Sequence, residues 1–198
     1  MNPASREATI DRTTGETAVH VRLILDGTGA AEVRTGLGFL DHMIGALFLH
    51  ARFDGAVRVD GDLDVDDHHT VEDAGLALGA ALDEALGDRG AIRRFGHAMA
   101  PLDEALARAV VDLSGRPGPH VDLGLQREMI GQVASENLGH FIESMAVTAR
   151  ATVHVDVLKG TNDHHRAEAA FKSLALALRT AVSRDDVPRM PSTKGVLG

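Results

Sequence analysis

A histidine-rich helix start occurs twice in this chain of 198 residues, at matching places in its two halves. The first copy reads DHHTVE over residues 67–72, and the second reads DHHRAE over residues 163–168. One copy alone is also typical of a capped helix with two solvated imidazoles. The apolar residues that follow repeat at the same offset and at helical spacing, which indicates duplication of a whole helix. The chain is therefore expected to fold as two similar halves.

Both halves have the same order of expected elements. In the first half we expect strands near 19–25, 31–35 and 57–59, and helices over 37–53 and from 67 to near 87. In the second half we expect strands near 108–113, 121–125 and 153–157, and helices over 135–150 and after 163. This order predicts an α+β fold of two tandem, internally duplicated sandwich-like halves, each a roughly four-stranded sheet with two helices on one face. We place the halves at 1–90 and 91–187, followed by a tail at 188–198.

Charge and composition exclude several classes of function. The formal net charge of −9 argues against a general nucleic-acid-binding face, because phosphate backbones are bound by basic surfaces. Residues 1–6 contain no apolar signal region, and no stretch is long enough to span a bilayer. Cysteine is absent, so histidine and carboxylate are the available metal-binding groups. We expect a soluble, cytoplasmic protein with no nucleic-acid and no membrane partner.

Histidines and glutamates of the two halves form equivalent pairs. His42 lies in FLDHM and His140 in NLGHF, at nearly the same separation as the two helix starts. Divided evenly, the paired residues give two sites with four protein ligands each, which leaves open positions on a six-coordinate metal. The eight candidate ligands are His42, His68, His69, Glu72, His140, His164, His165 and Glu168.

Helical geometry limits how these ligands combine. At about 100° per residue, His68 and Glu72 share one edge of the helix while His69 points well away. Adjacent histidines are therefore expected to serve different metals, although the sequence leaves open which four ligands bind which ion. A site of this composition accepts Mn²⁺, Fe²⁺, Co²⁺ or Zn²⁺. The histidines without a counterpart are interpreted as strand or surface residues: His20, His50, His97, His120 and His154.

Three segments could bind an anionic substrate in spite of the negative net charge. They are AIRRF at 91–95, SGRPG at 114–118 and PSTKG at 191–195. Each also has an ordinary interpretation, namely a helix-flanking charge pair, a turn and a disordered terminus.

Taken together, these motifs resemble those of the imidazoleglycerol-phosphate dehydratase family, the manganese-dependent enzymes of histidine biosynthesis. The resemblance covers nearly the whole chain. It depends on FLDHM at 39–43, DHHTVED at 67–73, IRRFG at 92–96, DLSGRP at 112–117, HHRAEAAFK at 164–172 and PSTKG at 191–195. Leu102 stands where the family pattern leads us to expect methionine, and acidic residues crowd 60–67, but neither departure touches a motif residue.

The resemblance implies a 24-subunit shell built from trimers, with active sites between subunits and two Mn²⁺ ions held by the eight ligands. It implies a substrate-phosphate site made by Arg94, Arg116, Lys172, Ser192 and Lys194. It also places Glu16 at the family position for proton transfer, and we group Glu72 and Glu168 with it as catalytic carboxylates.

The implied reaction is the dehydration of D-erythro-imidazole-glycerol phosphate to imidazole acetol phosphate and water. No hydrogen of this substrate is strongly acidic, but a ring N–H held near a dication should lose its proton far more easily. We therefore expect a metal-bound imidazolate that expels the side-chain hydroxyl through a diazafulvene-like intermediate.

Two other functions fit parts of the pattern. A dinuclear metallohydrolase would use two ions about 4 Å apart to activate water for phosphoester cleavage, but this chain is poor in bridging carboxylates and rich in imidazole. In a second alternative the metals only join subunits, and substitution of Lys194 would then change nothing measurable.

Overall fold

The computed structural model describes residues 6–185, in which two four-stranded sheets enclose four helices. The first sheet has the order β1-β2-β4-β3, with β1 at Glu7–Thr13, β2 at Thr17–Ile24, β4 at Asp54–Gly61 and β3 at Ala31–Arg34. The second has the order β5-β6-β10-β7, with β5 at Phe95–Leu102, β6 at Ala105–Asp112, β10 at Thr152–Lys159 and β7 at Gly118–Asp122. The helices are α1 (Gly38–Ala51), α2 (His68–Leu86), α3 (Ser135–Thr148) and α4 (Asp163–Val182). A small hairpin of β8 (Met129–Ile130) and β9 (Val133–Ala134) precedes α3.

Each sheet has one face toward the helices and one face toward solvent, and strand alternation explains why. In β2, Val19, Val21 and Leu23 are buried, whereas the residues between them are half-buried or exposed. Side chains of a strand alternate between the two faces, so this pattern directs the apolar set toward the helices. The pairing order is the same in both sheets: three antiparallel strands and one parallel edge strand, β3 or β7.

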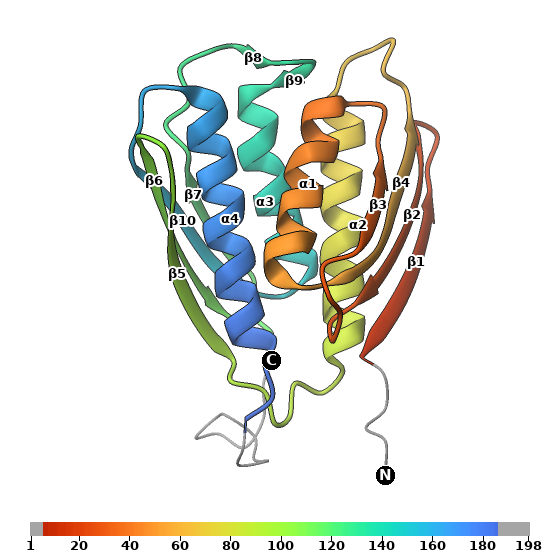
Figure 1. Cartoon of the computed structure of the whole chain (residues 1–198). Helices are drawn as coiled ribbons and strands as arrows, with labels where there is room; N and C mark the ends of the chain where they lie inside the picture. Colours follow the sequence, from red (N-terminus) through yellow and green to blue (C-terminus); the bar gives the residue numbers. More distant parts are fainter. Residues whose placement is uncertain (1–5, 186–198) are drawn as a thin grey trace.

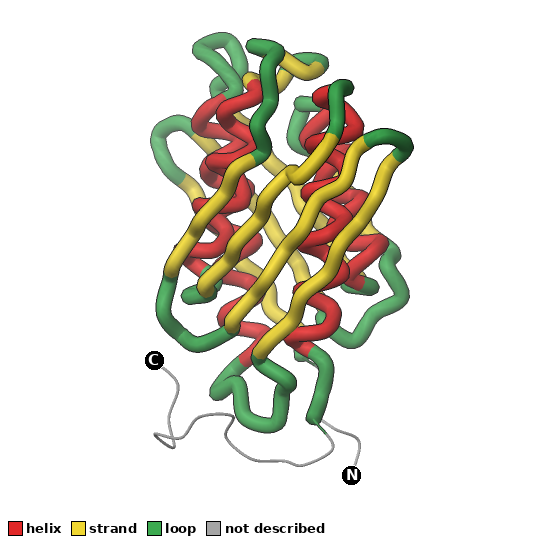
Figure 2. Tube along the Cα trace, turned by 90° about the vertical axis from the view of Figure 1, so that its left-hand side faces the viewer, coloured by secondary structure: helices red, strands yellow, loops and turns green. Residues whose placement is uncertain are grey.

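The helices lie between the two sheets, so that the sheets form the outer layers of the molecule (Figure 1). Figure 2 views the second sheet face-on, with helices behind it. Helices of different halves pack against each other, α1 against α4 and α2 against α3. One apolar core therefore contains residues of both halves.

Close approach of α2 to α3 depends on glycine. A Cβ added at Gly79 would lie 2.2 Å from the carbonyl oxygen of Met145 and 2.2 Å from the hydroxyl of Thr148. Glycine permits such backbone contact because it has no Cβ. The crossing places the first turns of α2 and α3 side by side, where several of the candidate ligands lie.

This architecture confirms the predicted fold class of an α+β protein with two four-stranded sheets and four helices. The expected strands did not include β1, β5, β8 or β9. Gly90 lies between α2 and β5, and the division into halves at 1–90 and 91–187 stays a prediction. The predicted tail at 188–198 lies outside the described residues. Among residues 6–185, no helix combines the length and apolar character needed to cross a membrane.

Candidate metal centre

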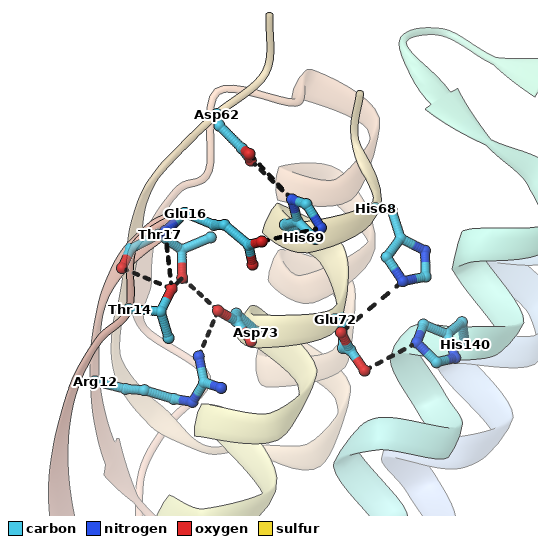
Figure 3. Close-up of polar contacts among 10 residues, drawn as sticks. All are labelled: Arg12, Thr14, Glu16, Thr17, Asp62, His68, His69, Glu72, Asp73 and His140. Carbon is cyan, nitrogen blue, oxygen red and sulfur yellow. Dashed lines mark hydrogen bonds and ion pairs between the residues drawn. The ribbon is translucent and has the colours of Figure 1, made fainter. Parts of the chain in front are cut away.

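Three of the predicted ligands meet where α2 crosses α3. His68 and Glu72 lie one turn apart on α2, and His140 faces them from α3 (Figure 3). The Nε2 atom of His140 is 3.4 Å from Glu72 Oε1, and that of His68 is 3.9 Å from Glu72 Oε2. The two imidazoles are stacked, with ring centroids 5.0 Å apart. One potential ligand atom of each residue lies within 4.8 Å of the others, a spacing that one ion could bridge.

A second cluster forms in the same way where α1 packs against α4. His164 and Glu168 lie one turn apart on α4, and His42 projects from α1. The Nε2 atoms of both histidines lie 3.2 Å from Glu168 Oε2. In each cluster the histidine and glutamate of one helix lie together because residues i and i+4 share a helix face. A single histidine from the other half completes each group.

The donor set of both clusters fits a divalent transition metal, since imidazole nitrogen and carboxylate oxygen are ligands such ions accept. The Nε2 atom of His140 is buried and makes no hydrogen bond, although Glu72 is nearby. A buried polar atom without a hydrogen bond is unfavourable, and a metal ion would satisfy it. The imidazole of His68, in the same cluster, is oriented by Asn137, whose Oδ1 lies 3.2 Å from His68 Nδ1.

The aspartate that opens each motif is structural. Asp67 is buried and its Oδ2 accepts a hydrogen bond from the backbone N–H of Ala134, immediately before α3. Asp163 is buried and accepts hydrogen bonds from the backbone N–H groups of Gln126 and Arg127. These bonds hold the segment before α3 against the two helix starts that carry the histidines.

The charged neighbours of Glu168 favour its ionised form. Burial by itself would raise the pKa of Glu168, but hydrogen bonds and charge interactions with Lys172 and His42 lower the pKa below its ordinary value. The Lys172 ammonium lies 2.6 Å from Glu168 Oε1. Glu168 is thus held as an anion, the form in which a carboxylate binds metal.

His69 and His165 are not part of either cluster within the chain. His69 lies on the side of α2 toward the β1–β2 turn, with Nδ1 3.0 Å from Asp62 Oδ2 and Nε2 3.7 Å from Glu16 Oε1 (Figure 3). The hydrogen bond with Asp62 is the main cause that raises the pKa of His69. His69 therefore lies apart from the cluster that contains His68, and the assignment of adjacent histidines to different metals stays a prediction.

His165 has a similar environment in the second half. Its Nδ1 lies 2.8 Å from Glu104 Oε2, and its Nε2 lies 3.7 Å from Asp103 Oδ2. Interaction with Glu104 raises the pKa of His165, and the same contact together with two backbone N–H groups holds the pKa of Glu104 well below its usual range.

Glu16 is exposed at the end of the β1–β2 turn, and hydrogen bonds of neighbouring residues fix the backbone of this turn (Figure 3). The hydroxyl of Thr14 accepts hydrogen bonds from the backbone N–H groups of Glu16 and Thr17, at 3.1 and 3.0 Å. Buried Asp73 of α2 binds the Thr17 hydroxyl and the guanidinium of Arg12. The turn is thereby tied to the helix that carries His68 and Glu72.

The predicted phosphate-binding residues are spread over the chain. Arg94 makes two hydrogen bonds to Asp112, and its backbone N–H donates to the carbonyl of Ala181 near the end of α4. Lys172 lies nine residues earlier on α4, which is about 13 Å along a helix axis. Arg116 is exposed in the loop before β7, and the remaining two, Ser192 and Lys194, lie outside the described residues.

A cavity of about 870 Å³ adjoins the α2–α3 cluster. His68 and His140 line it together with the segment at 121–128, including Gln126, Arg127 and Glu128. Its volume is sufficient for a small phosphorylated molecule.

The sequence pattern did not single out the segment at 121–128 as part of a site, nor did it single out Asp62, Asp103, Glu104 or Asn137. The only signal for Asp62 was the acidic run at 60–67, and Asp103-Glu104 stood out only as neighbours of Leu102.

The fold and the two clusters define an internally duplicated α+β protein with two candidate metal-binding groups of histidine and glutamate. Comparison with known proteins gives the family. The family model for imidazoleglycerol-phosphate dehydratase matches residues 35–178. A relative of the same name from Phytophthora nicotianae is 57% identical over 97% of this chain and 42% of its own length. Another, from Candida glabrata, is 53% identical over 96% of this chain and 99% of its own length.

A solved structure supports the same assignment. The crystal structure of IGPD from Pyrococcus furiosus superposes with a TM-score of 0.81 at 38% identity, covering 95% of this chain and 100% of that chain. The chain belongs to the imidazoleglycerol-phosphate dehydratase family, whose members are hydro-lyases.

Proposed function

We propose that the chain catalyses the dehydration of imidazoleglycerol phosphate to imidazole acetol phosphate and water in histidine biosynthesis. Membership of the family carries this proposal, and the two histidine–glutamate clusters give it a chemical basis. An imidazole substrate suits a site rich in imidazole ligands, because a ring nitrogen can complete the same coordination sphere.

Each cluster binds one divalent ion, Mn²⁺ by family resemblance. Three ligands come from within the chain: His68, Glu72 and His140 for one ion, and His42, His164 and Glu168 for the other. His69 and His165 point elsewhere, so they serve as the fourth ligands of clusters in other subunits. When bound, the ions supply positive charge that lowers the pKa of a substrate ring N–H.

The protein side chains then orient the substrate and move its protons. Glu16 stands 3.7 Å from His69 Nε2, at the rim of a site that His69 helps to build, and its exposed carboxylate can take and return a side-chain proton. Arg94, Arg116, Lys172, Ser192 and Lys194 hold the substrate phosphate. Arg94, which precedes β5, contacts α4 about 13 Å along the helix axis from Lys172, and this separation supports a phosphate site completed by neighbouring subunits.

The active form is a homo-oligomer in the cytoplasm, with 24 subunits built from trimers. Two observations support the need for more than one chain. Each cluster has three ligands where four were expected, and the two remaining histidines face away from both clusters.

The test is turnover of imidazoleglycerol phosphate by chelator-stripped protein before and after addition of Mn²⁺, together with the variants His42→Ala and His140→Ala. We expect product only with metal and a large loss of turnover in both variants. His20→Ala is the matched control, because His20 is paired with Asp11 on the outer face of the first sheet. Metal-independent turnover, or full activity in both cluster variants, would refute the proposed centre.

The same assay separates the competing functions. Release of inorganic phosphate without imidazole acetol phosphate would identify a metallohydrolase. Metal binding without any product, unaffected by Lys194→Ala, would identify ions that only join subunits.

A further inference from the structure

We propose that Asp62 and Glu104 are positioning residues, which orient His69 and His165 so that each Nε2 lone pair is available to a metal ion of another subunit. This inference rests on the proposed function, because it assigns a purpose to carboxylates that are themselves outside the two clusters.

In the first half, Asp62 follows β4 and directs both carboxylate oxygens at one nitrogen. Oδ1 and Oδ2 lie 3.2 and 3.0 Å from His69 Nδ1 (Figure 3). The backbone N–H of Asp62 donates to the carbonyl of Glu16 at 3.2 Å, which fixes Asp62 relative to the β1–β2 turn. The His69 ring is consequently held at the start of α2 against the residue that follows β4.

In the second half, Glu104 holds His165 from the β5–β6 turn. Its Oε2 lies 2.8 Å from His165 Nδ1, while its Oε1 accepts hydrogen bonds from the backbone N–H groups of Thr161 and Asn162 at 3.0 and 2.9 Å. Asn162 in turn caps α4 by accepting a hydrogen bond from the backbone N–H of His164. Glu104 therefore fixes both the ring of His165 and the start of the helix that carries it.

These contacts select one form of the imidazole. An ionised carboxylate only accepts hydrogen bonds, so Nδ1 must carry the proton in both pairs. A neutral ring with its proton on Nδ1 has its lone pair on Nε2, the form in which histidine binds metal through that atom. Asp62 and Glu104 thus fix both the tautomer and the direction of the lone pair.

The two halves reach this result with different elements. Glu16 immediately precedes β2 and Glu104 immediately precedes β6, so the two glutamates occupy equivalent turn positions. The second half uses its turn glutamate to hold the histidine. The first half takes the carboxylate from Asp62 instead, which leaves the carboxylate of Glu16 on the Nε2 side of His69 and 55% exposed. This division of roles explains why one turn glutamate is available for proton transfer and the other is not.

The experiment measures Mn²⁺ binding and particle size for the purified oligomer and for Asp62→Ala and Glu104→Ala. We expect Mn²⁺ affinity to fall by about 10–100-fold in each alanine variant, the usual effect of losing such a partner. The conservative variants Asp62→Asn and Glu104→Gln keep an acceptor oxygen and should recover most of that loss. Asp11→Ala is the matched control, because Asp11 makes a similar contact, 2.7 Å, with Nδ1 of His20 far from both clusters.

Folding is checked separately by circular dichroism, because Glu104 also holds the start of α4. If Glu104→Ala does not fold, Asp62→Ala and the two conservative variants decide the matter. Unchanged Mn²⁺ affinity and particle size in folded Asp62→Ala, with active wild-type protein, would overturn this inference alone. Wild-type protein that neither binds Mn²⁺ nor forms product would instead refute the proposed function.

Discussion

At the scale of single residues, the carboxylate of Glu16 combines exposure with a firm backbone anchor. Thr14, Thr17 and Asp73 fix the turn, and among residues 6–185 the one ion-pair partner of the carboxylate is His69, with Nε2 at 3.7 Å. We predict that Glu16→Gln lowers kcat by about 10²–10⁴-fold, because the amide has the same size but cannot exchange protons. Substrate KM and bound Mn²⁺ should remain close to wild type. Near-normal kcat would remove Glu16 from proton transfer.

Asp54 gives a pH-dependent contribution to stability. Its Oδ1 accepts hydrogen bonds from the backbone N–H groups of Thr28, Gly29 and Ala30, at 2.7 to 2.8 Å. The bonds from Ala30 and Thr28 are the largest causes of a lowered pKa of Asp54. A carboxyl group with a lowered pKa in the folded state stabilises the protein above its unfolded-state pKa, and the contribution is lost as the pH falls through the folded-state value.

We therefore predict a specific difference between wild type and Asp54→Asn, which keeps an oxygen acceptor but does not titrate. Below about pH 5, as the pH falls through the unfolded-state pKa toward the lower folded-state pKa, the free energy of unfolding of wild type should fall more steeply than that of the variant. Urea unfolding at several pH values measures the difference. Parallel curves would show that Asp54 does not contribute through its charge.

The sequence could identify the candidate metal ligands but not the side chains that contact them. His68, Glu72, His164 and Glu168 follow from a duplicated pattern at helical spacing, and the structure places them as that spacing requires. Asp62 is one of several acidic residues in the run at 60–67, and nothing in the run distinguishes it. The position of the end of β4 relative to α2 determines which carboxylate reaches His69.

At the scale of elements, the sequence predicted the four helices and the buried strands, and it missed two sheet-edge strands. In β1 only Ala8 is buried, and β5 contains Pro101 and has an exposed Phe95. Edge strands have one unpaired side and little apolar alternation, so periodicity gives a weak signal for them. The missing strands are those that pair with β2 and β6, and they complete the four-stranded sheets.

The crossing of α2 and α3 provides a test of packing at this scale. Gly79→Ala should destabilise the protein by about 1–3 kcal/mol, since the added methyl group would overlap the Met145 carbonyl and the Thr148 hydroxyl. Gly45→Ala in α1 is the matched control, because, apart from its chain neighbours and the adjacent backbone of α1, no atom of the described residues lies within 4 Å of the added Cβ. That control should be stabilised by about 0.5–1 kcal/mol from helix propensity. Thermal or urea unfolding of both variants measures the contrast, and equal effects would argue against a close contact at Gly79.

At the scale of the whole molecule, the arrangement of the clusters follows from packing between the halves. The sequence paired His42 with His140 as equivalents, but it left open which histidine joins which helix. In the structure each of them joins the opposite half, because α1 packs against α4 and α2 against α3. Such long-range packing has no local signature, so residue spacing alone could not predict it.

The same packing leads to the final prediction, on assembly. Each chain brings three candidate ligands into each of two clusters and presents His69 and His165 elsewhere, so the four-ligand sites of the proposed function require a second chain. Metal binding and subunit association are then thermodynamically linked, because an ion that binds only the assembled form stabilises it. Chelation should convert a large particle into smaller species, and Mn²⁺ should restore it, as measured by light scattering. His69→Ala and His165→Ala keep the three-ligand clusters but should lose this Mn²⁺ response, whereas His20→Ala should retain it. If the particle size changes neither on removal of metal nor in these variants, the ions do not connect subunits.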